Sequence, residues 1–260
     1  MTAEEQRVCM ELLQLAGQII MVSGGETYRV EETITRMGAA LGLGEVGCFA
    51  VPSGIMISFR LADGTAEAVV KRVRPGSTDL SRVDRVNGIS RLLEAGKITM
   101  PEALEQLQAI RDEPSSGRWL PLAAAICAGG FALMFGGGIP DFLVAFAVAG
   151  LAQMLLGLLT GRMHMQSLAA AFLGSMVETL LPMLTALLWP VIRPETVIAG
   201  ALMPLLPGLA MTKAVQDTLR GDMLSGTSHG VQALLTAALV AGGTLVASAI
   251  FRLLTGGAAG

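Results

Sequence analysis

The sequence predicts an α+β soluble N-terminal domain, with the element order ααβββαα, over residues 1–118, and an all-α membrane domain of about five helices over residues 119–260. The first observation behind this division is charge: residues 1–118 hold 13 Lys/Arg and 16 Asp/Glu, whereas residues 119–260 hold 5 of each. The second is that the C-terminal part contains long runs without any charged residue. Because a soluble domain of that size must face water, such runs indicate a bilayer.

Two helices open the N-terminal domain. Apolar residues recur with a 4-3-4-3 spacing that places them on one helical face, and Ser23-Gly24-Gly25 ends that helix. A second helix is expected from about Glu26 up to the glycines at 42 and 44. The apolar positions of the two stripes are Val8, Leu12, Leu15, Ile19 and Val22, followed by Val30, Ile34, Met37 and Leu41.

Three short β-strands are expected next, at residues 46–51, 55–61 and 65–73. Ala62-Asp63-Gly64 joins the last two, and an Asp-Gly pair is a strong hairpin signal. Two helices complete the domain, and the second begins at Thr99 with a capping box to Glu102.

Five apolar segments follow, at residues 119–135, 142–159, 168–189, 197–211 and 231–254. A membrane span needs about 20 residues, with shorter ones allowed. Basic residues near the ends of the spans set the orientation. A cytoplasmic N-terminus puts five of them inside and two outside, and this favours a cytoplasmic N-terminal domain and an external C-terminus. The inside group is Arg111, Arg118, Arg162, Lys213 and Arg220, and the outside group is Arg193 and Arg252.

Glu178 is the one acidic residue well inside a predicted span, and an intramembrane carboxyl is a functional candidate by default. Pro182, four residues later, has no N–H to bond the carbonyl of Glu178. This turn therefore offers a carboxyl and a backbone acceptor to a proton, a cation or an ammonium group. The alternatives are a protonated carboxyl, a hydrogen bond to another helix, or a tilt that carries Glu178 to water.

Pro204, Pro207 and Gly208 are expected to break the fourth span, as in transporters that use broken helices to build midplane sites. The alternative is a kinked or interfacial helix that ends there. Beyond the break, Asp217 and Arg220 stand i,i+3 on a short helix. They are interpreted either as a gate latch or as a solvated surface pair.

In the N-terminal domain, Arg29 lies within one helical turn of Glu26 and Glu32, and Tyr28 and Glu31 belong to the same charged stretch. Ser23 and Ser53 are not in a G-x-S-x-G motif, and the domain has no histidine to act as a base, so hydrolase chemistry is not indicated. No catalytic residue, metal site or cofactor is predicted. Neither part is strongly basic, which argues against nucleic-acid binding.

Several segments resemble the threonine/serine exporter family. They are residues 23–33 (SGGETYRVEET), 51–55 (VPSGI), 87–91 (N-x-x-S-R) and 206–212 (LPG-x-AMT), with Asp217, Gly221-Asp222 and Ser225-Gly226 after them. The resemblance implies a cytoplasmic N-terminal domain and a multi-span export domain in the bacterial inner membrane. It further implies export of threonine and serine by a long form. In a split form, dicarboxylate (succinate) export is attributed to the larger of two subunits. The end of the chain at Gly260, without a second hydrophobic block, favours the split form.

The expected function is a secondary exporter of a small hydrophilic metabolite that works with a small polytopic membrane subunit. No Walker A motif is present, so the proton gradient is the expected energy source, by analogy. Small-residue faces at Gly157/Gly161 and Ala233/Ala237/Ala241 offer places to dock the partner, and a homo-oligomer is the alternative. The competing functions are a membrane-anchored enzyme and a ligand-binding scaffold, each acting through the N-terminal domain.

Overall fold

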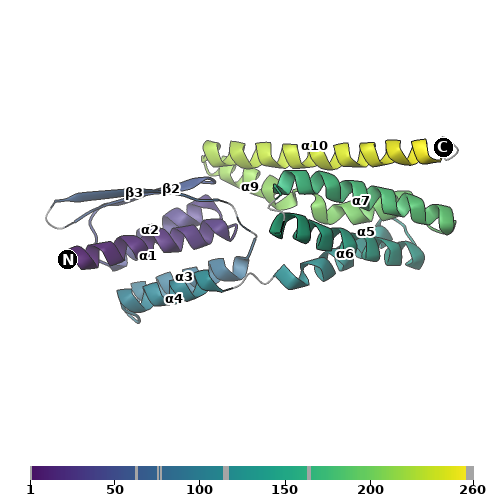
Figure 1. Cartoon of the computed structure of the whole chain (residues 1–260). Coiled ribbons are helices and arrows are strands. Elements are labelled where there is room, and N and C mark those ends of the chain that lie inside the picture. Colours follow the sequence, from purple (N-terminus) through teal and green to yellow (C-terminus); the bar gives the residue numbers. More distant parts are fainter. Residues whose placement is uncertain are drawn as a thin grey trace. The chain divides into compact units, whose positions relative to one another are not determined.

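The computed structural model describes residues 2–61, 64–74, 76, 78–113, 117–162 and 165–255 (Figure 1). It divides into two compact units. The first contains residues 1–115 and 213–229, and the second contains residues 116–212 and 230–260. The predicted domain boundary after residue 118 concerns independent folding and stays a prediction.

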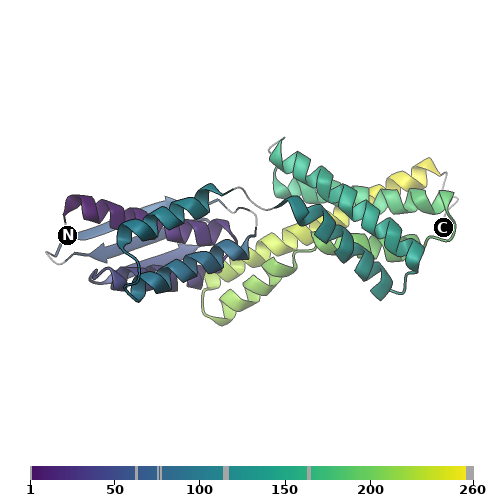
Figure 2. The same ribbon diagram turned by 90° about the horizontal axis from the view of Figure 1, so that it is seen from below.

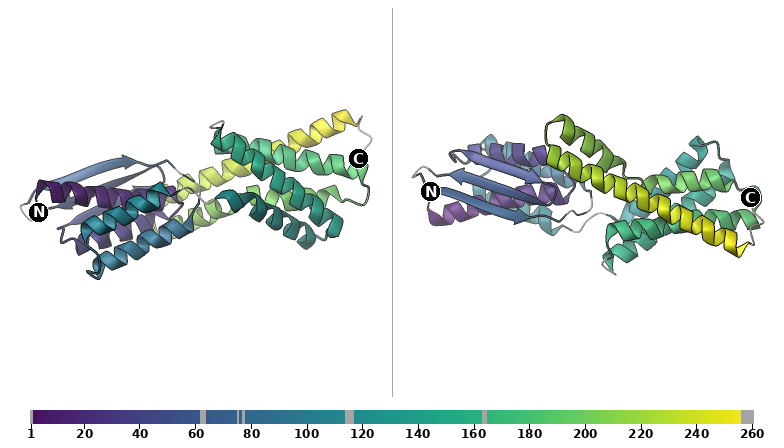
Figure 3. Two further views of the ribbon diagram at one scale, coloured as in Figure 1. Left: turned by 60° about the horizontal axis from the view of Figure 1, so that its bottom comes forward. Right: turned by 90° about the horizontal axis from the view of Figure 1, so that it is seen from above.

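The first unit is a three-stranded antiparallel sheet with helices packed on one face (Figures 2 and 3). Thr2 with Glu5, and Thr99 with Glu102, form capping boxes that start the first and last helices. The Ala62-Asp63 part of the predicted hairpin turn lies outside the described residues. The elements are α1 (Ala3–Val22), α2 (Thr27–Ala40), β1 (Val46–Val51), β2 (Gly54–Arg60), β3 (Ala66–Arg72), α3 (Leu80–Glu94) and α4 (Met100–Asp112).

Alternation along β2 divides the sheet into an inner and an outer face. Ile55, Ile57 and Phe59 are buried, and the residues between them are exposed or half-buried. Leu12 and Ile34 complete this core from α1 and α2. The first unit is thus a one-sided α/β layer with a large-aliphatic core.

The second unit is a helical bundle whose helices approach closely through small residues (Figure 1). An ideal Cβ on Gly200 would lie 2.6 Å from the carbonyl oxygen of Ala128, so α8 contacts the backbone of α5 directly. The elements are η1 (Gly117–Trp119), α5 (Leu120–Met134), α6 (Ile139–Gly161), α7 (Ser167–Leu188), α8 (Pro194–Leu202), η2 (Met203–Leu205), the start of α9 (Gly208–Leu219) and most of α10 (Met223–Leu254).

The predicted fold class is wrong. Among the described residues, three helices (α6, α7 and α10) are long and apolar enough to cross a membrane, or four if the bent pair α8–η2 and α9 is one span. The first predicted span is α5, which is only 15 residues long. It ends at Phe135 because Gly136 takes the left-handed conformation (φ +86°), and a helix of that length rises only about 22 Å.

The position of residues 213–229 also departs from the predicted order, in which a soluble N-terminal domain is followed by a membrane domain. The described residues contain ten α-helices and a small three-stranded sheet, so the chain is mostly helical. Residues 213–229, which follow the broken span, group with the N-terminal elements rather than with the bundle. Local periodicity does not report such long-range packing, and this is why the sequence reading missed it.

Candidate functional site

Glu178 lies in the interior of the second unit, on α7, and is 1% exposed. Ser175 and Thr179 on the same helix are also buried, and their hydroxyls donate to the carbonyls of Phe172 and Ser175 at 2.8 Å. Among the described residues, the Oε2 atom of Glu178 has no hydrogen-bond partner. The carboxyl is therefore buried on a helix whose two buried hydroxyl groups already donate their protons to backbone carbonyls.

Pro182 lies one turn after Glu178 and is also buried, yet α7 continues through it to Leu188. Because proline has no N–H, the usual i,i+4 bond to the carbonyl of Glu178 is missing. Thr179 also contacts Thr244 of α10, with 3.3 Å between the two hydroxyl oxygens. This part of α7 thus combines an unpaired carboxyl oxygen, a freed carbonyl and a polar contact to α10.

The fourth predicted span is broken, as its prolines indicate. α8 and η2 end near Leu205, α9 begins at Gly208, and the two arms meet at a bend of 50°. A hollow of about 280 Å³ lies beside the break within the second unit. Its lining includes Gln153, Gly157, Thr160, Ser167, Pro204 and Leu205. The break therefore borders a partly polar hollow, and its role as a site stays a prediction.

In the first unit, hydrogen bonds join the segment from the α1–α2 loop to the start of α2 with α9 and the turn between α9 and α10. The ammonium group of Lys213 donates to the carbonyl of Gly24. The hydroxyl of Thr27 donates to Oδ2 of Asp222 at 3.0 Å. The guanidinium carbon of Arg220 lies 3.3 Å from the centre of the Tyr28 ring. Two segments about 190 residues apart in the sequence therefore form one polar cluster, called here the loop cluster.

Asp217 does not pair with Arg220, contrary to the i,i+3 interpretation. Its carboxylate is 2% exposed and lies 2.8 Å from Nδ1 of His229 on α10. His229 is therefore a cluster residue that sequence reasoning missed, because twelve residues and a turn separate it from Asp217. Gly226 allows this approach, since an ideal Cβ there would lie 2.3 Å from the Thr218 hydroxyl oxygen.

Asp222 caps the N-terminus of α10. Its Oδ1 accepts from the backbone N–H of Ser225 at 3.1 Å. Burial alone would raise the pKa of Asp222, but its contacts with Ser225 and Thr27 and the nearby His229 outweigh burial and hold the pKa below its ordinary value. The Ser225 hydroxyl lies near the same carboxylate but forms no hydrogen bond of good geometry with any described residue, although Ser225 is fully buried.

The other N-terminal candidates lie at different places. Glu26 pairs with Arg29 at 2.6 Å. Glu31 accepts from the backbone N–H of Ala50 at 3.0 Å, which ties α2 to the end of β1. Ser53 lies exposed in the turn between β1 and β2 and belongs to no polar cluster of the described chain. The structure thus brings Tyr28 to Arg220, while Glu31 and Ser53 lie apart from this contact.

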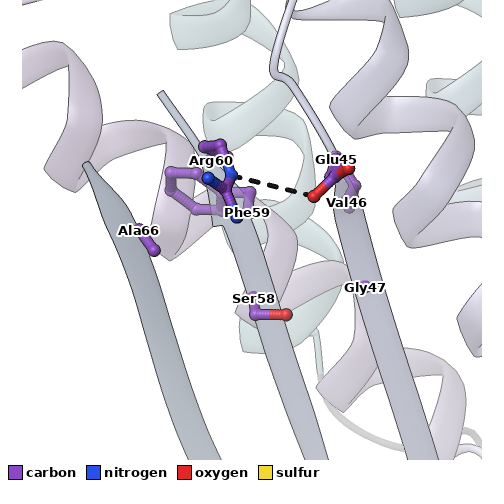
Figure 4. A pocket seen from close by; sticks show the side chains of 7 residues that line it. All are labelled: Glu45, Val46, Gly47, Ser58, Phe59, Arg60 and Ala66. Carbon is purple, nitrogen blue, oxygen red and sulfur yellow. Dashed lines mark ion pairs between the residues drawn. The ribbon is translucent and has the colours of Figure 1, made fainter. Parts of the chain in front are cut away.

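An open hollow of about 470 Å³ lies on the outer face of the sheet (Figure 4). Glu45 and Arg60 flank it, 3.7 Å apart, with Ser58 beside them. Its ion pair is exposed and self-satisfied, so it offers no chemistry beyond a surface contact. Elsewhere in the described residues, no three His, Cys, Asp or Glu side chains are placed to hold a metal ion.

The chain matches one family model over residues 11–251, and that family is described as "Putative threonine/serine exporter". The chain belongs to the threonine/serine exporter family. The resemblance predicted from the motifs is confirmed. Membership in this family, together with the long apolar helices, supports a multi-pass membrane protein.

Two kinds of relative are found among curated proteins. A "Probable threonine/serine exporter" of Mycobacterium tuberculosis is 26% identical over 91% of this chain and 45% of its own length. A "Probable succinate transporter subunit YjjP" of Klebsiella aerogenes is 25% identical over 92% of both chains. Its Escherichia coli counterpart is 24% identical over 93% of this chain and 94% of its own. The chain thus spans less than half of the mycobacterial relative, and no solved structure matches it.

Proposed function

We propose that the chain is part of a proton-coupled secondary exporter for a small hydrophilic metabolite, either threonine or serine or a short dicarboxylate. The printed names of its relatives supply these substrate classes. We place the first unit in the cytoplasm and the apolar helices in the bacterial inner membrane. The orientation follows from what the family resemblance implies, a cytoplasmic N-terminal domain before a multi-span export domain.

The observation that carries the proposal is the unpaired carboxyl of Glu178. An ionised carboxylate in an apolar interior is costly, so a group of this kind either binds a proton or pairs with a cation. Its Oε2 atom, which has no hydrogen-bond partner among the described residues, is available to bind either a proton or a cation. Export then requires Glu178 to exchange its proton when water or the metabolite reaches it, and this exchange couples transport to the proton gradient.

The test of this role is export by cells carrying Glu178→Gln, with Glu195→Gln as the matched control. Glu195 is an exposed acid at the start of α8 in the same unit. We expect the Glu178→Gln chain to insert normally, to lose most of its export, and to lose the pH dependence of what remains. Export by the Glu178→Asp chain should fall between that of the wild type and that of Glu178→Gln. Normal, pH-dependent export by Glu178→Gln would leave the hollow beside Pro204 as the better candidate.

We further propose that a second membrane subunit completes the transporter. The YjjP relatives are named as subunits and align over nearly the whole chain. Ideal Cβ atoms on Gly157 and Gly161 would touch nothing within 4 Å, and Ala237 and Ala241 are exposed. Ala233, the third residue of the predicted alanine face, is buried within the chain, so the exposed positions that could pack against another helix are Gly157, Gly161, Ala237 and Ala241. The alternative occupant is a second copy of this chain.

Reconstitution separates these assemblies. The purified chain should give no flux in liposomes and should gain flux when a small helical membrane partner is added. Flux by a monomer alone would contradict the need for any partner, and flux only by a dimer or larger homo-oligomer would replace the partner with a second copy. The orientation has its own test, since a membrane-impermeant thiol reagent should not reach Gly64→Cys in intact cells.

A further inference from the structure

The backbone that carries Arg220 is held by the turn that ends α9. The N–H of Arg220 donates to the carbonyls of Gln216 at 3.1 Å and Asp217 at 3.2 Å. Gly221 then takes the left-handed conformation at φ +87°, and the N–H of Asp222 returns to the Asp217 carbonyl at 2.9 Å. This arrangement is a glycine-based C-terminal cap. Arg220 therefore projects from a fixed position, at a helix end where a cation is favoured.

The side chain of Arg220 is also fixed, because its guanidinium lies directly over the face of Tyr28. A separation of 3.3 Å from the ring centre is possible only above the ring plane. Tyr28 in turn occupies the first turn of α2, and the preceding residue, Thr27, is bonded to Asp222 at 3.0 Å. Two adjacent contacts thus hold the α2 start and the α9–α10 turn together.

The N–H groups of this guanidinium have no protein partner among the described residues. Arg29 provides the contrast: it lies 5.5 Å from the same ring, but its Nε donates to Glu26 at 2.6 Å. A guanidinium stacked on one face keeps its N–H fork free at the edges, and that fork matches the two oxygens of a carboxylate. The stacking removes rotamer freedom in advance, so less entropy is lost when a ligand binds.

We propose that Arg220, stacked on Tyr28, binds a carboxylate group of the exported metabolite. This inference rests on the proposed function, since threonine, serine and succinate all carry such a group. The neighbouring Asp222 adds a preference. Its carboxylate is held ionised by its contacts with Ser225 and Thr27, so it attracts an ammonium group and repels a second carboxylate. An α-amino acid therefore fits the loop cluster better than a dicarboxylate.

Binding to the purified full chain in nanodiscs tests the site directly. The probes are L-threonine, L-threonine methyl ester, which lacks the ionised carboxylate, and succinate. Threonine should bind saturably, and succinate should bind more weakly than threonine. The ester should have a dissociation constant at least about tenfold higher than that of threonine, because a charged hydrogen-bonded pair is lost. Succinate binding tighter than threonine would keep the carboxylate site but overturn the preference assigned to Asp222.

Two variants and a control locate the carboxylate. Arg220→Gln should weaken threonine binding by about tenfold or more and abolish the difference between threonine and its ester. Tyr28→Leu should weaken binding by removing the platform, whereas Tyr28→Phe keeps the ring and should bind normally. The control is Arg60→Gln, which removes an exposed arginine from the same unit. No threonine binding by the wild-type chain, or unchanged selectivity in Arg220→Gln, would overturn the site.

Export measurements keep this inference separate from the proposed function. In cells that export the metabolite, Arg220→Gln should raise the internal concentration needed for half-maximal export while sparing the pH dependence assigned to Glu178. Export that depends on the gene but is unaffected by Arg220→Gln would overturn the Arg220 site and leave the exporter intact. Threonine binding at Arg220 without any gene-dependent export would overturn the exporter and leave the site.

Discussion

The two units bury opposite kinds of side chain. The first unit encloses large aliphatic residues such as Leu12 and Ile34 and carries most of the charge of the chain. The second encloses small residues such as Ala128 and Ala145, while large ones, Leu151 and Leu234 among them, are exposed. In water, the burial of large apolar groups drives packing, whereas in lipid, where the hydrophobic effect does not draw helices together, close contact of small residues does.

The buried carboxyl groups differ in whether they have partners. In the first unit, the buried carboxylate of Asp217 is paired with His229. In the second unit, Asp141 is fully engaged by backbone N–H groups, but Glu178 keeps a free oxygen. Because an unpaired carboxyl is most costly where water is absent, Glu178 is the exception that structural stability does not explain. The comparison therefore separates carboxyl groups that hold the fold from one that does not.

The largest effect is expected from Asp141→Ala in the second unit. Asp141 is 1% exposed and accepts from the N–H groups of Gly138 and Arg193, each at 2.8 Å. Alanine leaves both donors and the charge of Arg193 without their partner. We expect a loss of about 2–6 kcal/mol of unfolding free energy, because each of the two unsatisfied N–H groups costs about 1–3 kcal/mol. Unfolding in mixed micelles with rising SDS measures it.

Asp141→Asn is the control for that variant. It keeps one acceptor oxygen and should lose about half as much stability, within the roughly 1–3 kcal/mol of an unsatisfied group. Glu178→Gln should change stability far less than Asp141→Ala. A larger loss at Glu178 than at Asp141 would show that the comparison has assigned the two carboxyls the wrong way round.

A smaller effect is expected where glycines allow helix contact. Gly200→Ala places a Cβ 2.6 Å from a backbone oxygen on α5, and overpacking of this kind costs about 1–3 kcal/mol. Gly157→Ala meets nothing within 4 Å and should be neutral in the isolated chain. If a partner helix docks there, bulkier Gly157→Leu should leave the isolated chain stable but reduce export and co-purification of the partner. Equal stability losses at both glycines would remove this distinction.

Parts of this structure could be predicted from the sequence. The proline-rich break and the isolation of Glu178 in an apolar helix follow from local composition. The span count could not be obtained that way, because α5 reads as an apolar run but ends where Gly136 turns left-handed. The loop cluster could not be predicted from local spacing either: Tyr28 and Arg220 are distant in sequence, and the i,i+3 rule assigned Asp217 the wrong partner.

A smaller loss of unfolding free energy, about 1 kcal/mol and confined to the first unit, is expected from substitutions of Asp222. Asp222→Ala removes the α10 cap and should lose about that amount at pH 7. Asp222→Asn keeps a cap but not the charge. Because folding lowers the pKa of Asp222, its ionised form stabilises the fold above the ordinary value of 3.8, and that contribution disappears as pH falls through the folded-state pKa. The difference between wild type and Asp222→Asn should therefore shrink at low pH, and a difference that grows would contradict the lowered pKa.

The smallest effect concerns the alkylation rates of the native cysteines, which report whether water enters the aliphatic core of the first unit. Burial, with a smaller contribution from a nearby glutamate, raises the pKa of Cys9 from 9.0 to about 11 and that of Cys48 to about 12. The thiolate is the reactive form, so at pH 8 both should alkylate roughly 100-fold or more slowly than an exposed cysteine of ordinary pKa. Gly64→Cys supplies that reference, because Gly64 is exposed beyond β2. Site-resolved mass spectrometry of iodoacetamide-treated protein gives all three rates in one sample. Alkylation of Cys48 as fast as that of Gly64→Cys would show that the sheet opens readily to water, and the first unit would then lack the closed core on which its contrast with the lipid-facing bundle depends.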